Sequence, residues 1–278
     1  MVRTRTAVIF SAPMNRVIRS PEMQPSDIID AHAHCGRQDR SPPQALEDYL
    51  EHSRGSGIVG AVMFPPVYEI YDRYDYSFED NDHWRRRRDA ANRYLIELET
   101  PFEVIPFYFV WNDFAVDNIT PLHRGIKWHR HSDEPEYHYD DPRCLAVLSE
   151  IRRRNMPVVL EEEWHKTTMF IDTLASGIRV VIPHCGLLNG GYERFRRQDI
   201  WGHPDIYTDT SLVPGEVITD YVDRYGSERI MFGSDFPFGD PRHELGKIMR
   251  LRLADAEKEA LVGGNVRRLL GGGGGRVG

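Results

Sequence analysis

The sequence contains few cysteines, no long apolar segment and fewer basic than acidic residues. Its three cysteines, Cys35, Cys144 and Cys185, are an odd number at wide spacing, which is not the pattern of a disulfide framework. No segment approaches the roughly 20 apolar residues of a membrane-spanning helix, and the N-terminal residues do not resemble a signal peptide. We therefore expect a cytoplasmic protein that does not bind a membrane.

The shortage of basic residues also bears on the partners of the protein. The formal net charge of -8 repels phosphate backbones, so we expect no nucleic-acid partner. The run Arg85–Arg88 is the one local exception, and Asp80, Asp82 and Asp89 surround it. We interpret this run as a solvated helix face, with a site for an anionic substrate or partner as the alternative.

Several catalytic motifs are also absent. The sequence has no Gly-x-Ser-x-Gly segment, which argues against a serine hydrolase. No Walker or Gly-x-Gly-x-x-Gly segment follows an apolar run, which argues against a nucleotide-binding domain of those types.

Eight short apolar or β-branched runs alternate with helical patterns along the chain, an arrangement typical of parallel α/β folds. The 278 residues are close to the roughly 250 of one (β/α)8 barrel. We therefore predict an α/β protein with a single TIM-like (β/α)8 barrel domain over residues 1–270. Residues 271–278 begin with five glycines, and we expect a disordered Gly-rich tail there. The predicted strands are Ile28–Ala31, Ile58–Phe64, Glu103–Val110, Gly125–Trp128, Pro157–Glu161, Ile178–Ile182, Ile206–Asp209 and Arg229–Gly233.

Helical patterns fill several of the intervals between these strands. The predicted helices are Pro43–Ser53, Arg86–Leu98, Asp141–Asn155, Val217–Tyr225 and Glu257–Leu270. The long aromatic and acidic segment Pro65–Trp84 follows the second predicted strand. Because the loops after barrel strands build the active site, we interpret it as a lid or substrate-contact loop, with a packed surface loop as the alternative.

Three of the predicted strands end in side chains that can bind a metal ion. His32 and His34 lie at positions i and i+2, so both imidazoles point to the same side of the first strand. The sixth strand leads to His184 and the eighth to Asp235. Imidazole and carboxylate groups from three strands at one barrel rim predict a divalent-metal site, with zinc as the expected ion and manganese as the alternative.

These strings also resemble a known family. The segments 29–34 (IDAHAH), 125–127 (GIK), 183–186 (PHCG), 233–237 (GSDFP) and 264–270 (GNVRRLL) look like those of the amidohydrolase superfamily. The similarity is to its amidohydrolase 2 branch, which includes decarboxylases related to aminocarboxymuconate semialdehyde decarboxylase, together with lactonases and hydrolases. The matching segments span residues 28 to 270 in the expected order, and they do not specify the substrate.

The resemblance implies roles for individual residues. His32 and His34 are implied as metal ligands, and Asp235 as a ligand and proton shuttle. His184 is implied as a further ligand or as the group that orients water or substrate. Cys35 and Cys185, which adjoin candidate ligands, are interpreted as small packing residues rather than nucleophiles.

One departure from the branch occurs at the end of the fifth strand, where a histidine is usual and this sequence has Glu161. We expect Glu161 to bind the metal through oxygen. Glu163, on the same strand face, and His165 are alternative sources of that ligand. A further alternative is that this acidic cluster is a surface turn and that the metal site is weakened or lost.

The fourth strand adds a second group of candidates. Lys127 is expected to act in catalysis through a substrate-binding or electrostatic role; a carboxylated lysine that bridges two metals and an ion pair inside the barrel are the alternatives. His129 and Trp128 are expected to bind substrate, and His131 is interpreted as a hydrogen-bonding or substrate-contacting group; the alternative for His129 and His131 is that they bind a metal.

The leading hypothesis is therefore a hydrolase that cleaves a small amide, ester or lactone with a metal-activated water. The alternatives are a non-oxidative decarboxylase on the same site and a catalytically inactive binding barrel. The expected partner is a small-molecule substrate. Homodimers are common among such enzymes, but nothing in the sequence requires one.

Overall fold

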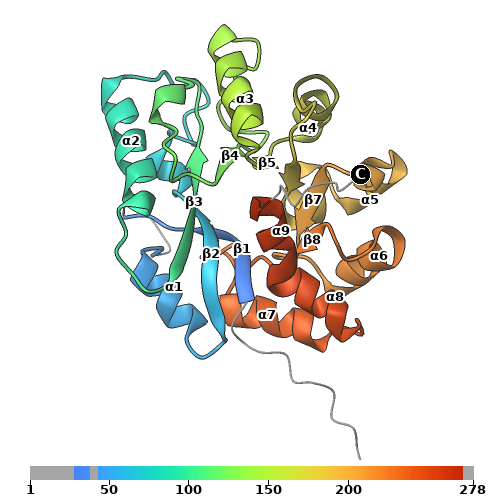
Figure 1. The fold of residues 1–278 in the computed structure, drawn as a ribbon. Helices are drawn as coiled ribbons and strands as arrows, with labels where there is room; N and C mark the ends of the chain where they lie inside the picture. Colours follow the sequence, from blue (N-terminus) through green and yellow to red (C-terminus); the bar gives the residue numbers. More distant parts are fainter. Residues whose placement is uncertain (1–27, 38–42, 272–278) are drawn as a thin grey trace, which may run out of the picture.

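Eight parallel strands form the centre of the molecule, in a computed structural model that describes residues 28–37 and 43–271. Each strand pairs with the next in chain order, and helices surround the strands on the outside (Figure 1). This arrangement confirms the predicted TIM-like (β/α)8 barrel. The strands are β1 (Ile28–His34), β2 (Ile58–Phe64), β3 (Glu103–Phe109), β4 (Gly125–His129), β5 (Val158–Glu161), β6 (Val180–Ile182), β7 (Ile206–Asp209) and β8 (Ile230–Met231).

The barrel closes between β1 and the residues that follow β8. The backbone nitrogen of Ala31 donates to the carbonyl of Phe232 at 2.8 Å, and that of His34 donates to the carbonyl of Phe236 at 2.8 Å. The nitrogen of Asp235 donates in turn to the carbonyl of His32 at 2.8 Å. The closing hydrogen bonds therefore join the two segments that carry three of the predicted metal ligands.

All five predicted helices are present, and the last one is divided by a π-helical turn. The α-helices are α1 (Leu46–Ser53), α2 (Asp82–Ile96), α3 (Pro142–Arg154), α4 (Trp164–Met169), α5 (Tyr192–Arg197), α6 (Gly215–Tyr225), α7 (Pro241–Arg250), α8 (Asp255–Glu259) and α9 (Asn265–Gly271). The shorter turns are η2 (Val67–Glu69), η3 (Val116–Asn118), η4 (Phe170–Leu174), η5 (His184–Asn189), η6 (Ile200–Gly202) and η7 (Ala260–Gly264). Helices α4, α5 and α7 have no counterpart among the predicted helices. Within the described ranges, no helix combines the length and the apolar character needed to cross a bilayer.

The barrel interior is filled with apolar side chains, and α9 covers one of its ends (Figure 1). Val266 and Leu269 of α9 belong to the same buried cluster as Ile29, Val181 and Met231 of the strands. Because these side chains fill the interior below the strand ends, the polar side chains collect at the opposite, C-terminal rim. Helix α9 ends at Gly271, the first residue of the predicted Gly-rich tail; the rest of that tail and the N-terminal residues 1–27 lie outside the described residues.

The Arg85–Arg88 run on α2 is a solvated face only in part. Arg88 is fully buried, and its guanidinium contacts Asp80, Asp113 and the carbonyl of Ile70. The interpretation of this run as a solvated face is therefore wrong for Arg88, whose guanidinium points into the protein and pairs with Asp80 and Asp113. Its neighbour Arg85 is half-exposed.

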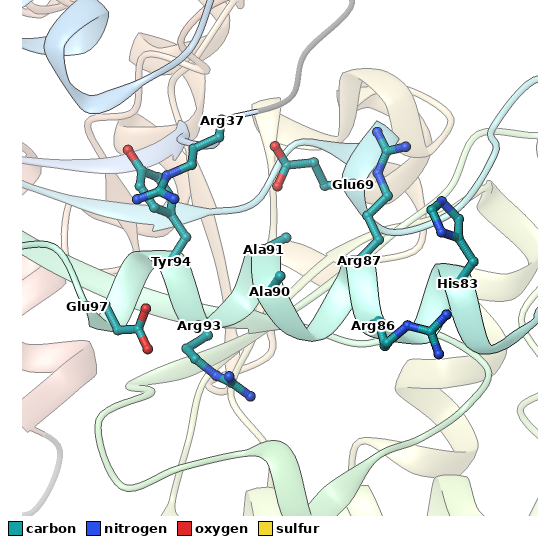
Figure 2. Close-up of a pocket in the computed structure, with 10 residues that line it drawn as sticks. All are labelled: Arg37, Glu69, His83, Arg86, Arg87, Ala90, Ala91, Arg93, Tyr94 and Glu97. Atoms are coloured by element: carbon teal, nitrogen blue, oxygen red, sulfur yellow. The ribbon is translucent and has the colours of Figure 1, made fainter.

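A groove runs beside this helix (Figure 2). Figure 2 shows Arg87 and Glu69 on one side of α2, with Arg86 and Arg93 on the other. The predicted metal ligands do not line it.

Candidate metal centre

His32, His34 and Asp235 meet at the C-terminal rim of the barrel. The Nε2 atom of His32 lies 3.3 Å from Oδ1 of Asp235, and Nε2 of His34 lies 3.4 Å from the same oxygen. All three residues are buried. The two histidines share a face of β1, and the closing hydrogen bonds between β1 and the segment after β8 bring the carboxylate to them.

These spacings suit a bound cation. An ion held by bonds of about 2.1 Å keeps adjacent ligand atoms about 3.0–3.4 Å apart, depending on its geometry. Burial lowers the pKa of His32 to about 4 and that of His34 to about 3, so both imidazoles are neutral. Neutral imidazole is the form that binds a metal. The donor set of two imidazoles and one carboxylate therefore fits a divalent ion such as zinc.

Asp209, at the end of β7, fixes the orientation of His32. Its Oδ2 lies 2.9 Å from Nδ1 of His32, which directs Nε2 of that ring towards Asp235. Such a carboxylate behind a ligating histidine is a common feature of metal sites. Asp209 is not among the site residues predicted from the sequence, although it ends an apolar predicted strand, as the other candidates do.

His184 lies beside this group, and its ligand atom lies within 4.8 Å of those of His32 and Asp209. Its Nδ1 lies 2.7 Å from the hydroxyl of Ser211, and its ring centroid is 4.8 Å from that of His32. The Nε2 atom is buried and forms no hydrogen bond, and it lies 3.7 Å from Oε2 of Glu161. Burial disfavours the imidazolium, but the carboxylates of Asp235, Glu161 and Asp209 raise the pKa of His184 to about 9. An unpartnered buried nitrogen in a carboxylate-rich site indicates a place for a ligand or substrate.

The backbone is strained at two of these positions. His184 has a φ of 56° and Asp235 a φ of 54°, in the left-handed region that non-glycine residues rarely adopt. Hydrogen bonds hold both, from the nitrogen of His184 to Asp209 at 3.2 Å and from that of Asp235 to the carbonyl of His32 at 2.8 Å. Such strain is concentrated at functional sites, where the surrounding structure maintains it.

Lys127 forms an ion pair inside the barrel. Its Nζ lies 2.8 Å from Oε2 of Glu161 and 3.4 Å from Nε2 of His32, and it lies over the ring of Phe64. This is one of the three arrangements considered for Lys127 from the sequence. The ammonium group therefore separates Glu161 from the histidines of β1.

Of the three candidates for the strand-five ligand, only Glu161 points into the barrel. Glu163 caps the N-terminus of α4, where its carboxylate accepts from the nitrogens of His165 and Lys166, and the side chain of His165 is exposed. The ligand atoms of Glu161 cluster with those of His129 and His131, within 4.8 Å of one another, and not with the group of His32.

Trp128 lies on the other side of β4 from Lys127, as the alternation of a strand requires. Its indole is fully buried and packs against Tyr137 and Phe170, in the layer between the strands and the helices. The structure thus contradicts a substrate-binding role for Trp128, because its ring does not face the barrel interior.

The three cysteines are buried and unpaired. Burial raises the pKa of Cys185 to about 12, and it raises that of Cys35 as well. Both thiols are thus protonated at neutral pH, as expected for packing residues rather than nucleophiles.

The segment Pro65–Trp84 reaches the rim through two side chains. Tyr71 is buried and stacks on Trp111, and its hydroxyl lies 2.6 Å from Oε2 of Glu134. Arg73 also pairs with Glu134. The segment therefore packs against the loop that follows β4.

The fold and the polar rim define an enzyme of the amidohydrolase type. The sequence profile described as Amidohydrolase matches residues 29–272, so the chain belongs to this family. Among curated proteins, none matches the sequence.

Solved structures share the fold at low identity. A dihydroxybenzoic acid decarboxylase from Polaromonas, with bound manganese and 2-nitroresorcinol, is 12% identical with a TM-score of 0.66, covering 88% of this chain and 97% of its own. The 5-carboxyvanillate decarboxylase from Sphingomonas paucimobilis is 13% identical, with a TM-score of 0.63, and the match covers 88% of this chain and 99% of the decarboxylase chain. A protein from Pseudomonas putida proposed to be a 2-pyrone-4,6-dicarboxylic acid hydrolase is 16% identical, with a TM-score of 0.62. The match covers 88% of this chain and 98% of the other chain.

Proposed function

We propose that this enzyme is a metal-dependent hydrolase that cleaves a small amide, ester or lactone. In this proposal His32, His34 and Asp235 hold one divalent ion, zinc or alternatively manganese. The observation that carries it is the approach of both Nε2 atoms to one carboxylate oxygen, at 3.3 and 3.4 Å. When bound, such an ion lowers the pKa of a coordinated water towards about 7 and polarises a substrate carbonyl.

Besides the metal ion, Asp235, His184 and Lys127 would each contribute to the reaction. Asp235 would accept the proton of the attacking water and return it to the leaving group. Burial raises the pKa of Asp235, which makes its carboxylate a better base than an exposed aspartate. Nε2–H of His184, which lies 3.7 Å from Glu161 and forms no hydrogen bond, would donate to the substrate carbonyl oxygen, and the ammonium of Lys127 would stabilise negative charge as it develops there.

A decarboxylase on the same site is the second candidate. It is favoured by Phe238, which is 57% exposed and stands edge-on to the ring of His34, 5.8 Å away. An exposed aromatic ring beside the ligands suits an aromatic acid. Two of the similar structures described above are decarboxylases of aromatic acids.

The two candidates can be separated by their products. The protein would be stripped of metal, reloaded with zinc or manganese, and assayed on lactones, esters, amides and hydroxybenzoic acids in 18O-labelled water. Incorporation of label into a carboxylic acid product is the expected result, whereas release of CO2 together with a product that has lost its carboxylate would establish the decarboxylase.

Matched variants test the ligands. His34→Asn and Asp235→Asn are expected to lower kcat/KM by about 1,000-fold or more, because they remove metal ligands. His138→Asn, an exposed histidine on the same rim, serves as the control. Wild-type protein that binds no metal and turns over no member of the panel would refute the hydrolase and leave an inactive binding barrel.

A further inference from the structure

His129, His131 and Glu161 form a second group of potential ligands on the same rim. His129 ends β4 and Glu161 ends β5, and the two residues are paired in the sheet register. The Nε2 atom of His129 lies 3.2 Å from Oε1 of Glu161, and Nε2 of His131 lies 3.1 Å from the same oxygen. Two imidazole nitrogens thus converge on one carboxylate oxygen, as they do at Asp235.

The carboxylate of Glu134 lies behind both rings, close enough for ion pairs but without a hydrogen bond to either ring. Nδ1 of His131 lies 3.5 Å from Oε1 of Glu134, and Nδ1 of His129 lies 3.8 Å from its Oε2. Arg73 pairs with Glu134 and donates to Nδ1 of His131 at 3.1 Å, so binding of an ion at Nε2 requires the other tautomer of this ring, in which Nδ1 carries the hydrogen and faces Glu134. A buried carboxylate behind two histidines is the arrangement that orients metal ligands.

The hydroxyl of Tyr71 indicates which nitrogen of His129 carries the hydrogen. Its single proton faces two acceptors, Glu134 at 2.6 Å and the carbonyl of His129 at 2.9 Å. The oxygen of Tyr71, 3.4 Å from Nδ1 of His129, is then left to accept a hydrogen bond from that nitrogen. In neutral His129 the lone pair consequently lies on Nε2 and faces the carboxylate of Glu161, an arrangement that a cation between the two atoms would stabilise.

We propose that His129, His131 and Glu161 bind a second divalent cation, with zinc as the ion that this donor set suits. Two imidazoles and one glutamate form a known zinc ligand set, and ligand spacings near 3.2 Å fit bonds of about 2.1 Å. The side chain of His131 is 31% exposed, so the ion can enter from solvent, and a fourth position is open to water or substrate.

The second site is distinct from the one at His32. Lys127 stands between them, with its Nζ 2.8 Å from Oε2 of Glu161 and 3.4 Å from Nε2 of His32. Glu161 can therefore pair with Lys127 through one oxygen and bind the ion through the other. An ion at this site would add positive charge to the rim, which suits a substrate that carries a carboxylate.

Metal stoichiometry tests this proposal independently of activity. Chelator-treated full-length protein would be titrated with zinc and its bound metal measured by mass spectrometry after gel filtration. The wild type is expected to bind about two equivalents, and His129→Asn, His131→Asn and His34→Asn about one each. His138→Asn, in the same loop as His131, should retain two. A His131→Asn protein that binds as much zinc as the wild type overturns the second site.

The two proposals fail in different ways. Loss of one equivalent in His131→Asn but none in His34→Asn would refute the site at His32 and support this one. Anomalous diffraction at the zinc edge on wild-type crystals provides a test that needs no variant. A peak between His129, His131 and Glu161 supports the site, and its absence from zinc-soaked crystals overturns it.

Discussion

The carboxylate of Asp30 accepts hydrogen bonds from both the backbone nitrogen and the hydroxyl of Ser234, at 2.9 and 2.5 Å, although the two residues are 204 positions apart. Tyr49 and the nitrogen of His32 donate to the same carboxylate. Because Asp30 precedes the two histidines of β1 and Ser234 precedes Asp235, this pair fixes the two ligand-bearing segments against each other.

Ser234→Ala should therefore weaken both the fold and the metal site. Removing the hydroxyl deprives a fully buried carboxylate of one donor, at a cost of about 1–2 kcal/mol in the free energy of unfolding. We expect zinc affinity at the His32 site to fall about tenfold as Asp235 loses support. Urea unfolding of the metal-free protein and a zinc titration measure the two effects. Ser149→Ala on the exposed face of α3 should change neither; an equal effect there would contradict the prediction.

Asp209→Asn should lower metal affinity without removing a ligand. The amide cannot hold Nδ1–H of His32 as the carboxylate does, so the ring loses its preferred tautomer and orientation. The expected loss of zinc affinity is about 10–100-fold. Asp205→Asn, just before the same strand, is the matched control. Unchanged affinity in Asp209→Asn would show that His32 does not depend on this contact.

Substitutions of Arg88 and Arg85 should differ sharply in their effect on the free energy of unfolding, although both residues belong to one run of arginines. Arg88→Met leaves Asp113, whose side chain is 11% exposed, with no guanidinium partner, and we expect a loss of about 3 kcal/mol. Arg85→Met removes only half-exposed pairs with Asp80 and Asp82 and should cost less than about 1 kcal/mol. Chemical denaturation of both variants compares them directly, and similar losses would be inconsistent with the structure.

His123 should make stability dependent on pH. Burial lowers its pKa from 6.5 to about 4, and its Nδ1 accepts a hydrogen bond from the nitrogen of Thr120 at 3.0 Å. Because the folded pKa lies below the unfolded one, the unfolded chain binds more protons between these values. The stabilisation is thus complete above pH 6.5 and is lost as the pH falls towards 4.

His123→Asn should remove this part of the acid sensitivity. The difference in unfolding free energy between pH 7 and pH 4 should be smaller in the variant by up to about 3 kcal/mol. Metal-free protein is used for both measurements, so that the candidate ligands titrate alike. An identical pH dependence in the two proteins would show that His123 is not held neutral.

The strands could be predicted from sequence because buried parallel strands are near-continuous apolar runs. The limits of β2 and β7 match their predictions, Ile58–Phe64 and Ile206–Asp209. The predicted convergence at the rim depended on the same feature, because side chains that end parallel strands share one edge of the barrel.

The short helices were harder to predict, because six residues such as Trp164–Met169 carry little periodic signal. Helix α7 did have a signal, since Asp240 precedes Pro241 as an N-cap before the first helical position. The role of Asp209 was not predicted, because it depends on which neighbouring strand end faces His32. The environment of Glu161 depended on contacts of the loop after β4, which no local pattern specifies.

The packing of α9 against the barrel interior has a consequence for biosynthesis. Val266 and Leu269 cover apolar side chains contributed by strands from β1 onwards. A nascent chain that has emerged only as far as β8 would expose this interior to water, and such surfaces promote aggregation. The ribosome therefore delivers the helix that shields the first strands only after all eight strands, and the growing polypeptide is prone to aggregation until that helix has left the exit tunnel.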